Sequence, residues 1–250
     1  MAIIPSILIN YKSGFMSAEK IDEKAVAGIQ NQLSAAKQAG ATKYPVILNI
    51  SGAIVKYSNY NYWGTQSIIR AVRQLDSMDE VSGVLFNIDS GGGMVSGTAE
   101  LTAAIKDMAK PTIAFTNGYM CSAALQIASG ANMRISSPYA DLIGSIGTMM
   151  SYQDFEAMFE NWGAKIYEVY APQSTEKNFE WRQLMSGDPK AYEKWLEELA
   201  GDFISLMKTN ISGIKDDGHV FKGKTYTPAG ALEVGLIDEI CSLDEALSKF

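Results

Sequence analysis

Ser122 lies within residues 115–128, at the junction between an apolar run and a helix of small residues. A serine at the first turn of a helix is typically an N-cap, which satisfies a backbone N–H and performs no chemistry. Its neighbours favour a second role, because Gly118 permits a tight turn and Ala123–Ala124 leave the space above the hydroxyl open. A hydroxyl placed in this way could attack a carbonyl group, with the next N–H facing the oxyanion.

A glycine-rich turn, Ser90-Gly91-Gly92-Gly93, comes earlier in the chain, between the apolar run 83–88 and a helix that we expect to end near Met108. Such a turn can hold a phosphate on its amides, but its spacing matches neither GxGxxG nor GxxxxGK(S/T), so a nucleotide site is not favoured. Glycines can equally bring a bare N–H close to a reacting carbonyl oxygen. Both turns follow strands of one expected parallel sheet, and ligands bind at that carboxyl edge.

A serine nucleophile needs a base, and the sequence offers a histidine and two lysines. His219 lies in the turn-like stretch 215–220, away from any expected sheet edge, which is typical of a solvated loop histidine. A neutral lysine amine can also accept the hydroxyl proton when burial lowers its pKa. Lys177, in the polar loop 171–187, is the first candidate and Lys165 is the second. A solvated surface lysine is the ordinary alternative for both.

The elements that carry these turns follow a strand–helix–strand pattern. Apolar runs rich in β-branched residues predict strands at 44–50, 83–88, 112–116, 133–136, 142–149 and 165–170. Helical spacing predicts helices at 65–78, from about 95 to 108, at 152–161, at 189–210 and from 243 onward. Because the strands show no alternation of polarity, the pattern indicates an α/β fold with a parallel sheet covered on both faces.

Residues 1–43 are expected to form an extension ahead of the main domain, which we place at 44–250. Apolar residues recur at helical spacing from Ser17 and stop at Gly40, which predicts an amphipathic helix that covers the core or contacts a partner. The loop 51–64 is rich in tyrosine. Its aromatic side chains could line a substrate groove, form a subunit contact or pack within the loop itself.

The composition, with 47% apolar and 20% charged residues among 250, is that of an ordinary globular domain. A net charge of −7 argues against nucleic-acid binding. Cys121 and Cys241 form no CxxC pair, which indicates a reducing compartment without disulfides, and the single histidine disfavours a metal site. Residues 1–9 are interrupted by Pro5 and too short to span a bilayer, so we expect a cytoplasmic protein without a membrane anchor.

Four motifs follow one another along the chain: Ile88–Gly93, Ser122–Ala124 with Ala140-Asp141 downstream, Gly144–Gly147 and Gly223–Glu239. Together, and in this order, they resemble the S49 serine peptidases, which comprise the signal peptide peptidase A enzymes and the prohead proteases of tailed phages. The similarity runs from about residue 44 to residue 240. It implies a ClpP/crotonase-like α/β fold, in which a mostly parallel sheet is built from repeated ββα and βαβ units with flanking helices.

The resemblance also implies a Ser–Lys dyad. Ser122 matches the nucleophile, and Lys177, 55 residues later, matches the lysine that takes its proton. Ser145 matches the family's second serine, whose hydroxyl orients the lysine amine. The sequence around Lys177 is a poor match to the family's loop, so Lys165 stays open as an alternative base.

For the oxyanion hole, the resemblance implies two backbone donors. The N–H of Gly93, in preference to that of Gly92, supplies one, and the N–H of Ala123 supplies the other. Gly91 stands where the family usually has proline, which loosens the turn without removing the donor. No metal and no cofactor enter this mechanism.

Members of the family assemble into rings, and in some the lysine comes from a neighbouring subunit. The resemblance therefore implies a homo-oligomer that acts on proteins or peptides. A single catalytic repeat without an anchor favours the phage prohead proteases, whose substrates are capsid, portal and scaffold proteins, over a cytoplasmic bacterial peptidase of the signal peptide peptidase A type. Two other hypotheses stay open: a non-proteolytic assembly protein on the same fold, and an acyl-CoA enzyme of the crotonase type, which would not use Ser122.

Overall fold

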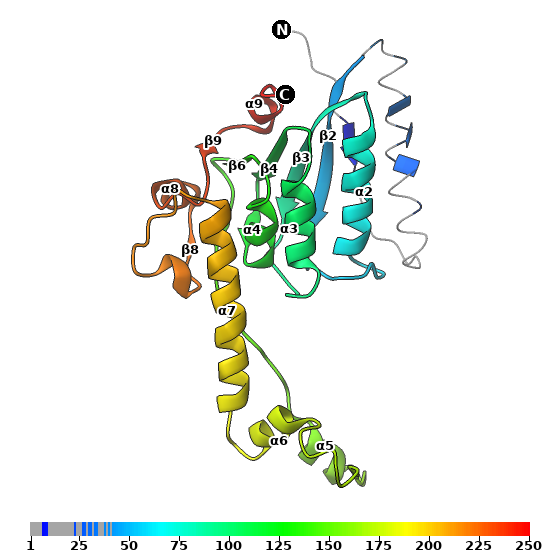
Figure 1. The fold of residues 1–250 in the computed structure, drawn as a ribbon, viewed down its shortest axis with the longest axis vertical. Helices are drawn as coiled ribbons and strands as arrows, with labels where there is room; N and C mark the ends of the chain where they lie inside the picture. Colours follow the sequence, from blue (N-terminus) through cyan, green and yellow to red (C-terminus); the bar gives the residue numbers. More distant parts are fainter. Residues whose placement is uncertain are drawn as a thin grey trace. The chain divides into compact units, whose positions relative to one another are not determined.

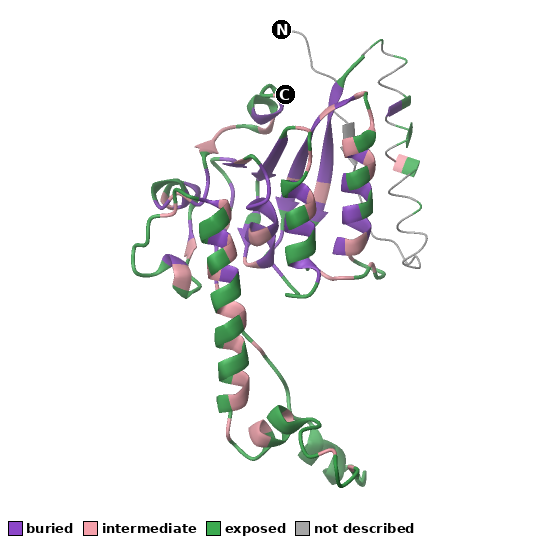
Figure 2. Cartoon of the chain, in the orientation of Figure 1, coloured by how far each residue is buried: buried purple, intermediate pink, exposed green. Residues whose placement is uncertain are grey.

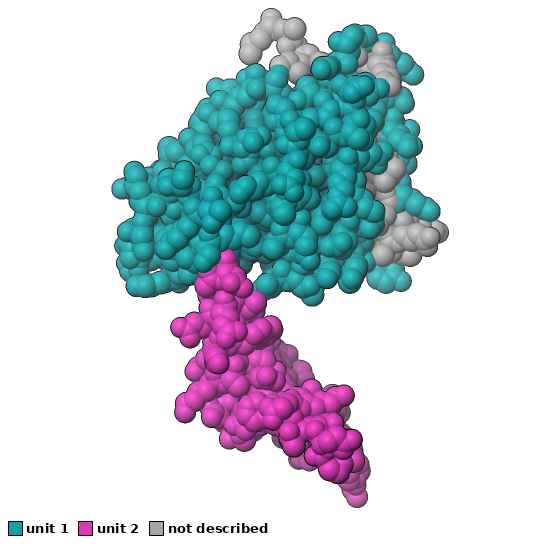
Figure 3. Space-filling model, viewed as in Figure 1, with its two compact units in different colours: residues 1–147, 203–250 teal, residues 148–202 magenta. Residues whose placement is uncertain are grey.

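The computed structural model describes residues 42–250 without a gap and, before them, residues 7–9, 23, 27, 28, 30, 31, 33, 34, 38 and 40. The chain divides into two compact units, which Figure 3 colours separately. The first unit comprises residues 1–147 and 203–250, and the second comprises residues 148–202. The candidate residues divide between them, because Ser122 belongs to the first unit and Lys177 to the second.

Within the described part of the chain, a six-stranded parallel sheet forms the centre of the first unit (Figure 1). In spatial order its strands are β1 (Ile7–Ile9), β2 (Tyr44–Ser51), β3 (Val81–Asp89), β4 (Thr112–Thr116), β6 (Met133–Ser136) and β9 (Glu239–Ile240). All neighbouring pairs are parallel. The inner strands β2, β3 and β4 are buried along most of their length, as a sheet covered on both faces requires. The predicted α/β class is confirmed.

Successive residues of the inner strands pack into two separate cores. On β2, Val46 and Leu48 belong to the larger core, whereas Ile47 between them belongs to the smaller one. Helices cover the larger core, namely α2 (Thr65–Ser77), α3 (Thr98–Lys106) and α4 (Ala123–Ala128) (Figure 1). The smaller core is covered by α9 (Leu243–Leu247). Figure 2 shows the resulting purple layer of buried strands.

A second, smaller sheet in the first unit consists of β5 (Tyr119–Cys121), β7 (Leu142–Gly144) and β8 (Thr225–Tyr226). β5 runs parallel to β7, and β8 runs antiparallel to β7. The sequence analysis predicted no strand between the one at 112–116 and Ser122, but β5 lies between them. The predicted strand 142–149 is also too long, because Gly144 and Ser145 have φ values of 129° and 58° and so leave the extended region.

The C-terminal part of the first unit contains the end of α7 (Lys190–Asn210), a 3₁₀ turn η1 (Val220–Lys222) and α8 (Pro228–Glu233). α8 begins with proline in its first turn, and the Thr227 side chain accepts the N–H of Gly230. β8 and α8 lie within the motif 223–239 that the sequence analysis singled out. It attaches to β7 through the antiparallel pair with β8.

The second unit contains α5 (Glu156–Asn161), α6 (Phe179–Met185) and the beginning of α7. Among residues 148–202, all of which the structure describes, none is buried (Figure 2). The predicted strand 165–170 is wrong: this segment is irregular, because a β-branched run becomes a strand only when another strand satisfies its backbone. The loop predicted at 171–187 contains α6 instead.

The predicted N-terminal helix, residues 17–40, lies mostly outside the described residues. The positions of this range that are described from 23 to 38 are helical, and Leu33 is buried as part of the larger core. β1 pairs with β2, so the backbone of residues 7–9 contributes to the central sheet. The boundary that we placed at residue 43 stays a prediction.

Candidate active site

Ser122 has an unusual backbone conformation, with φ of 53° and ψ of −125°. It occupies the position before α4, but its side chain makes no capping hydrogen bond to that helix. The backbone is held instead, because its N–H donates to the carbonyl of Gly144 at 2.8 Å and its carbonyl accepts the N–H of Gln126 at 3.0 Å. The hydroxyl is therefore presented by a strained, anchored backbone, which is common at functional sites, and the helix-cap role is wrong.

The glycine-rich turn lies directly against this serine. A Cβ atom added to Gly92, whose φ is 109°, would lie 2.7 Å from Cβ and 3.1 Å from Oγ of Ser122. The carbonyl of Gly92 accepts the N–H of Ile54 at 2.9 Å, and the N–H of Met94 donates to the Ile54 carbonyl at 2.9 Å. Only a residue without a side chain fits at position 92, because both the space and the dihedral angle exclude Cβ.

The amides of this turn differ in their partners. The N–H of Gly92 donates to Oγ of Ser90 at 3.1 Å. The N–H of Gly93 makes no hydrogen bond within the described part of the chain, and Gly93 is exposed. The N–H of Ala123, at the start of α4, likewise has no partner among the described residues. These two N–H groups are available to an oxyanion, whereas that of Gly92 is occupied.

Ser145 lies beside Ser122 at the end of two paired strands of the smaller sheet. Cys121 on β5 and Gly144 on β7 are register partners, so the two serines directly follow paired residues of parallel strands. Both have positive φ values, 53° for Ser122 and 58° for Ser145. The N–H of Ser145 donates to the carbonyl of Lys224 at 2.8 Å. The structure thus brings together the nucleophile candidate, the second serine and the glycine-rich turn.

Cys121, the residue before Ser122, is a free thiol. It is buried, and its Sγ donates to the carbonyl of Leu142 at 3.3 Å. Burial raises the pKa of this thiol to about 11, so the thiolate is not formed near neutral pH. Of the two adjacent side chains, the serine hydroxyl is therefore the candidate nucleophile.

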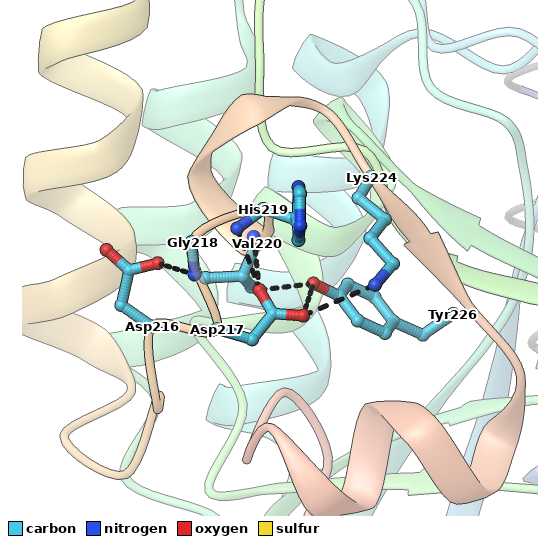
Figure 4. Close-up of polar contacts among 7 residues, drawn as sticks. All are labelled: Asp216, Asp217, Gly218, His219, Val220, Lys224 and Tyr226. Carbon is cyan, nitrogen blue, oxygen red and sulfur yellow. Dashed lines mark hydrogen bonds and ion pairs between the residues drawn. The ribbon is translucent and has the colours of Figure 1, made fainter.

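His219 is exposed in the loop that precedes η1, as the sequence analysis expected (Figure 4). Its backbone N–H donates to Oδ1 of Asp217 at 2.9 Å. Asp217 also accepts the N–H of Val220 at 2.8 Å and the hydroxyl of Tyr226 at 2.9 Å. Asp217, rather than the histidine, is the centre of this loop's polar contacts.

Lys224 completes the cluster around Asp217, with its Nζ 3.3 Å from Oδ2 of the carboxylate. Desolvation raises the pKa of the Asp217 carboxyl, but the hydrogen bonds that it accepts outweigh this effect and hold the pKa well below its usual range. Burial and the hydrogen bond to Asp217 raise the pKa of Tyr226 to about 12. The backbone carbonyl of Lys224 accepts the N–H of Ser145, so this lysine lies near the site. Its ammonium group, however, is paired with the Asp217 carboxylate and is unsuited to act as a base.

The two candidate bases lie in the second unit. Lys177 is exposed in the turn before α6, where its backbone N–H donates to the carbonyl of Ser174 at 3.2 Å, and Lys165 is exposed in the irregular segment before it. Within the described part of the first unit, no lysine nitrogen is hydrogen-bonded to Oγ of Ser122. The pairing of a lysine with Ser122 stays a prediction.

Two residues with clear roles in this site were missed from the sequence. Ser90 binds the N–H two residues ahead, a contact typical of serine before a tight turn, so its position before three glycines was an available signal. Asp217 was seen only as part of a turn. Its contact with Tyr226 joins residues nine positions apart, and no local sequence pattern indicates it.

No helix in the described part of the chain is both long enough and apolar enough to cross a membrane. The family model of peptidase family S49 matches residues 104–250, which is more than half of the chain. This range contains Ser122, Ser145 and Lys177, whereas the glycine-rich turn precedes it.

Two phage proteins are similar in sequence. Capsid assembly protease C of Escherichia phage lambda is 34% identical over 135 residues, which are 50% of this chain and 30% of that protein. Head-tail preconnector protein GP5 of Enterobacteria phage P21 is 28% identical over 194 residues, 74% of this chain and 37% of that protein. The chain thus matches only about a third of the length of each phage protein.

A solved structure confirms the fold. A ClpP1 variant from Listeria monocytogenes superimposes with a TM-score of 0.53, at 14% identity, over 85% of this chain and 99% of that one. At this identity the likeness concerns the architecture alone. The expected ClpP-like α/β fold is therefore confirmed.

Proposed function

Because the chain belongs to peptidase family S49, we propose that it is a serine peptidase that hydrolyses peptide bonds with Ser122 as its nucleophile. The observation that carries this proposal is the geometry of Ser122: a hydroxyl that caps no helix, on a backbone anchored to β7, next to two N–H groups without partners in the described chain. Such an arrangement suits acyl transfer through a tetrahedral oxyanion.

In the proposed reaction, a neutral lysine amine takes the proton of Ser122 while Oγ forms a bond to the substrate carbonyl carbon. The carbonyl oxygen becomes an oxyanion that the N–H groups of Gly93 and Ala123 bind. The amide bond then breaks, and the lysine returns its proton to the departing amine. Water, deprotonated by the same lysine, releases the acyl group and restores Ser122.

Lys177 is the base that we propose, with Lys165 as the alternative, and Ser145 orients the amine. Lys224, whose carbonyl binds Ser145, is committed to Asp217, and the described first unit offers no lysine in contact with Ser122. The family resemblance supplies Lys177, whose ammonium group has no partner among the described residues.

We further propose that the enzyme is a homo-oligomer. Residues 148–202 include three of the four tryptophans, yet none of these residues is buried. Their exposed side chains include Trp162, which is 74% exposed, and Val169, which is 94% exposed. So large an apolar surface on one unit favours burial against another protein, and a second copy of the chain is the partner that the resemblance supplies. A neighbouring copy could then help to place Lys177.

The similarity to the two phage proteins supports a role in capsid maturation, with capsid, portal or scaffold proteins as substrates, inside the host cell or the prohead. The name of the lambda relative describes a capsid assembly protease. This finer assignment rests on those relatives, because the site geometry is equally suited to other protein substrates.

Replacement of Ser122 by alanine tests the proposal. We expect Ser122→Ala to lose both cleavage of denatured casein and labelling by a fluorophosphonate, because this substitution removes the oxygen that forms the acyl bond. Ser248→Ala is the matched control, since this exposed hydroxyl contacts only the carbonyl of Glu245. Full activity in the Ser122→Ala variant would exclude Ser122 as the nucleophile.

A further inference from the structure

Ser90 occupies the point at which the two turns of the site meet. It follows β3 and is only 2% exposed. Its N–H donates to the carbonyl of Tyr119 at 2.7 Å, and its carbonyl accepts the N–H of Cys121 at 3.1 Å. Its hydroxyl accepts the N–H of Gly92 at 3.1 Å. Ser90 is thus bonded to the glycine-rich turn on one side and to β5, which delivers Ser122, on the other.

We infer that Ser90 is a positioning residue for the oxyanion hole, an inference that rests on the proposed function. It acts in two ways. The hydroxyl fixes the orientation of the peptide before Gly92, and the backbone fixes the separation between the turn that carries Gly93 and the turn that carries Ala123. Ser90 itself does not touch the substrate.

The hydroxyl contact decides which amide of the turn is free. Gly92 has φ of 109°, and glycine can adopt many other conformations, so its own backbone does not hold this geometry. Both of its backbone groups are restrained: the N–H donates to Oγ of Ser90 at 3.1 Å, and the carbonyl accepts the N–H of Ile54 at 2.9 Å and the Ser90 hydroxyl at 3.5 Å. With both groups of Gly92 held, the following peptide is oriented too, and the N–H of Gly93 is left without a partner in the described structure.

The backbone contacts decide how far apart the two donors lie. Ser90 and Met120 form an isolated parallel bridge between the two turns. Gly93 lies three residues after Ser90 in the glycine-rich turn, and Ala123 lies three residues after Met120 at the start of α4. An oxyanion hole requires both donors at hydrogen-bonding distance from one oxygen, and small displacements of a donor weaken the transition state strongly.

A purely structural role for Ser90 makes a different prediction. Loss of a buried hydrogen bond would lower the stability of the fold, and kcat per folded molecule would not change. The positioning role predicts a fall in kcat with little change in the binding of the uncleaved peptide, because the oxyanion exists only in the transition state. The two roles are separated by comparing kcat with ground-state affinity.

The experiment uses the full chain and a peptide that spans a cleavage site mapped in casein. We expect Ser90→Ala to lower kcat by about tenfold or more, since loss of one oxyanion donor typically lowers it 10²–10³-fold. The dissociation constant of the same peptide, measured for Ser122→Ala with and without Ser90→Ala, should agree within about twofold. Ser90→Thr, which retains the hydroxyl, should recover part of the lost kcat.

Thr112→Val provides the matched control. Thr112 is also 2% exposed and lies at the beginning of β4, at the end away from the site. Its hydroxyl is hydrogen-bonded to Asn132. This variant should lose a comparable amount of thermal stability and keep kcat within about twofold. Amide exchange measured by NMR supplies a readout that does not depend on turnover: exchange of the Gly92 N–H should accelerate in Ser90→Ala and not in Thr112→Val.

The outcomes are distinct. If Ser90→Ala retains kcat, or loses no more of it than Thr112→Val, while the wild type is active, the positioning role is wrong and the proposed function stands. Unchanged exchange of the Gly92 amide in Ser90→Ala would also overturn it. A wild type that neither cleaves casein nor reacts with a fluorophosphonate overturns the proposed function, and the positioning role with it.

Discussion

The first and second units hold their candidate groups in opposite ways. Ser122 follows the short strand β5, and its backbone is bonded to Gly144 and Gln126. The glycine-rich turn beside it is bonded to Ile54 through the carbonyl of Gly92 and the N–H of Met94. Lys177 and Lys165 belong to residues 148–202, where no side chain is buried. The comparison teaches that the proposed nucleophile and oxyanion donors are held by the buried strands of the first unit, whereas no buried residue of the second unit holds the lysines proposed as the base.

The two units also differ in charge. Residues 148–202 carry five basic and eleven acidic side chains, a net charge of −6, while the whole chain carries −7. The first unit is therefore almost neutral. Like charges repel when two such units approach, and salt screens that repulsion. We therefore expect self-association to strengthen as ionic strength rises.

The largest effect is expected from removal of the base. Lys177→Met should lower kcat by roughly 10³-fold, because general base catalysis typically contributes 10²–10⁴-fold. Lys165→Met should stay within a few-fold of the wild type. Steady-state cleavage of casein-derived peptide measures both. A large loss in Lys165→Met alone would transfer the role to Lys165, and activity in both variants would exclude the Ser–Lys dyad.

A second substitution alters the glycine-rich turn of the first unit. Gly92→Ala should lower kcat by about 10²-fold, because the new Cβ would lie 2.7 Å from Cβ of Ser122 and would displace it. Gly91→Ala is the control, since a Cβ there meets nothing within 4 Å and Gly91 has no positive φ. The same kinetic assay applies. Equal losses in both variants would show that the turn tolerates no side chain at all, whatever its distance from Ser122.

A third change addresses the exposed surface of the second unit. Phe159 and Trp162 form an edge-to-face pair with ring centroids 5.9 Å apart, and both are exposed. Trp162→Ser should raise the dissociation constant of the oligomer about tenfold or more, as expected for an aromatic residue central to an interface. Light scattering during size exclusion measures it. Tyr139→Ser, which removes an 89% exposed aromatic residue from the first unit, should leave the oligomer unchanged.

The smallest effect concerns the cluster around Asp217, whose contacts all lie within the first unit. The folded-state pKa of Asp217 is lowered, so the carboxylate contributes stability above its unfolded pKa of about 3.9 and loses that contribution as pH falls further. Asp217→Asn should therefore have a lower Tm than the wild type at pH 7, and the difference should shrink below about pH 4. Asp216→Asn should change Tm less, because within the described structure the Asp216 carboxylate accepts only the N–H of Gly218. A difference in Tm that is independent of pH would contradict this assignment.

The parts that could be predicted from the sequence are those with a local cause. The strand at 44–50 and the helix at 65–78 follow from apolar patterning, and the junction at Ser122 follows from small residues after an apolar run. β5 has only three residues and pairs with β7, so it carries no pattern of its own. The run 165–170 has the composition of a strand, yet it is irregular because no neighbouring strand is available to it.

The same distinction holds for the site. The preference for Gly93 over Gly92 came from a resemblance, and the contact between Ser90 and Gly92 now gives a physical reason for it. This contact spans two residues and was open to prediction. The proximity of Ser145 to Ser122 depends instead on the register of β5 and β7, which joins segments 23 residues apart.

The backbone conformation of Ser122 affects which residues evolution would favour at this position. Its φ and ψ of 53° and −125° disfavour any residue with a Cβ, at a penalty of about 1–3 kcal/mol, and glycine would relieve it. Selection for stability alone would therefore favour glycine at this position, and glycine has no hydroxyl. Under the proposed function, selection for turnover opposes that change, and a descendant freed from it should acquire glycine here and become more stable and inactive.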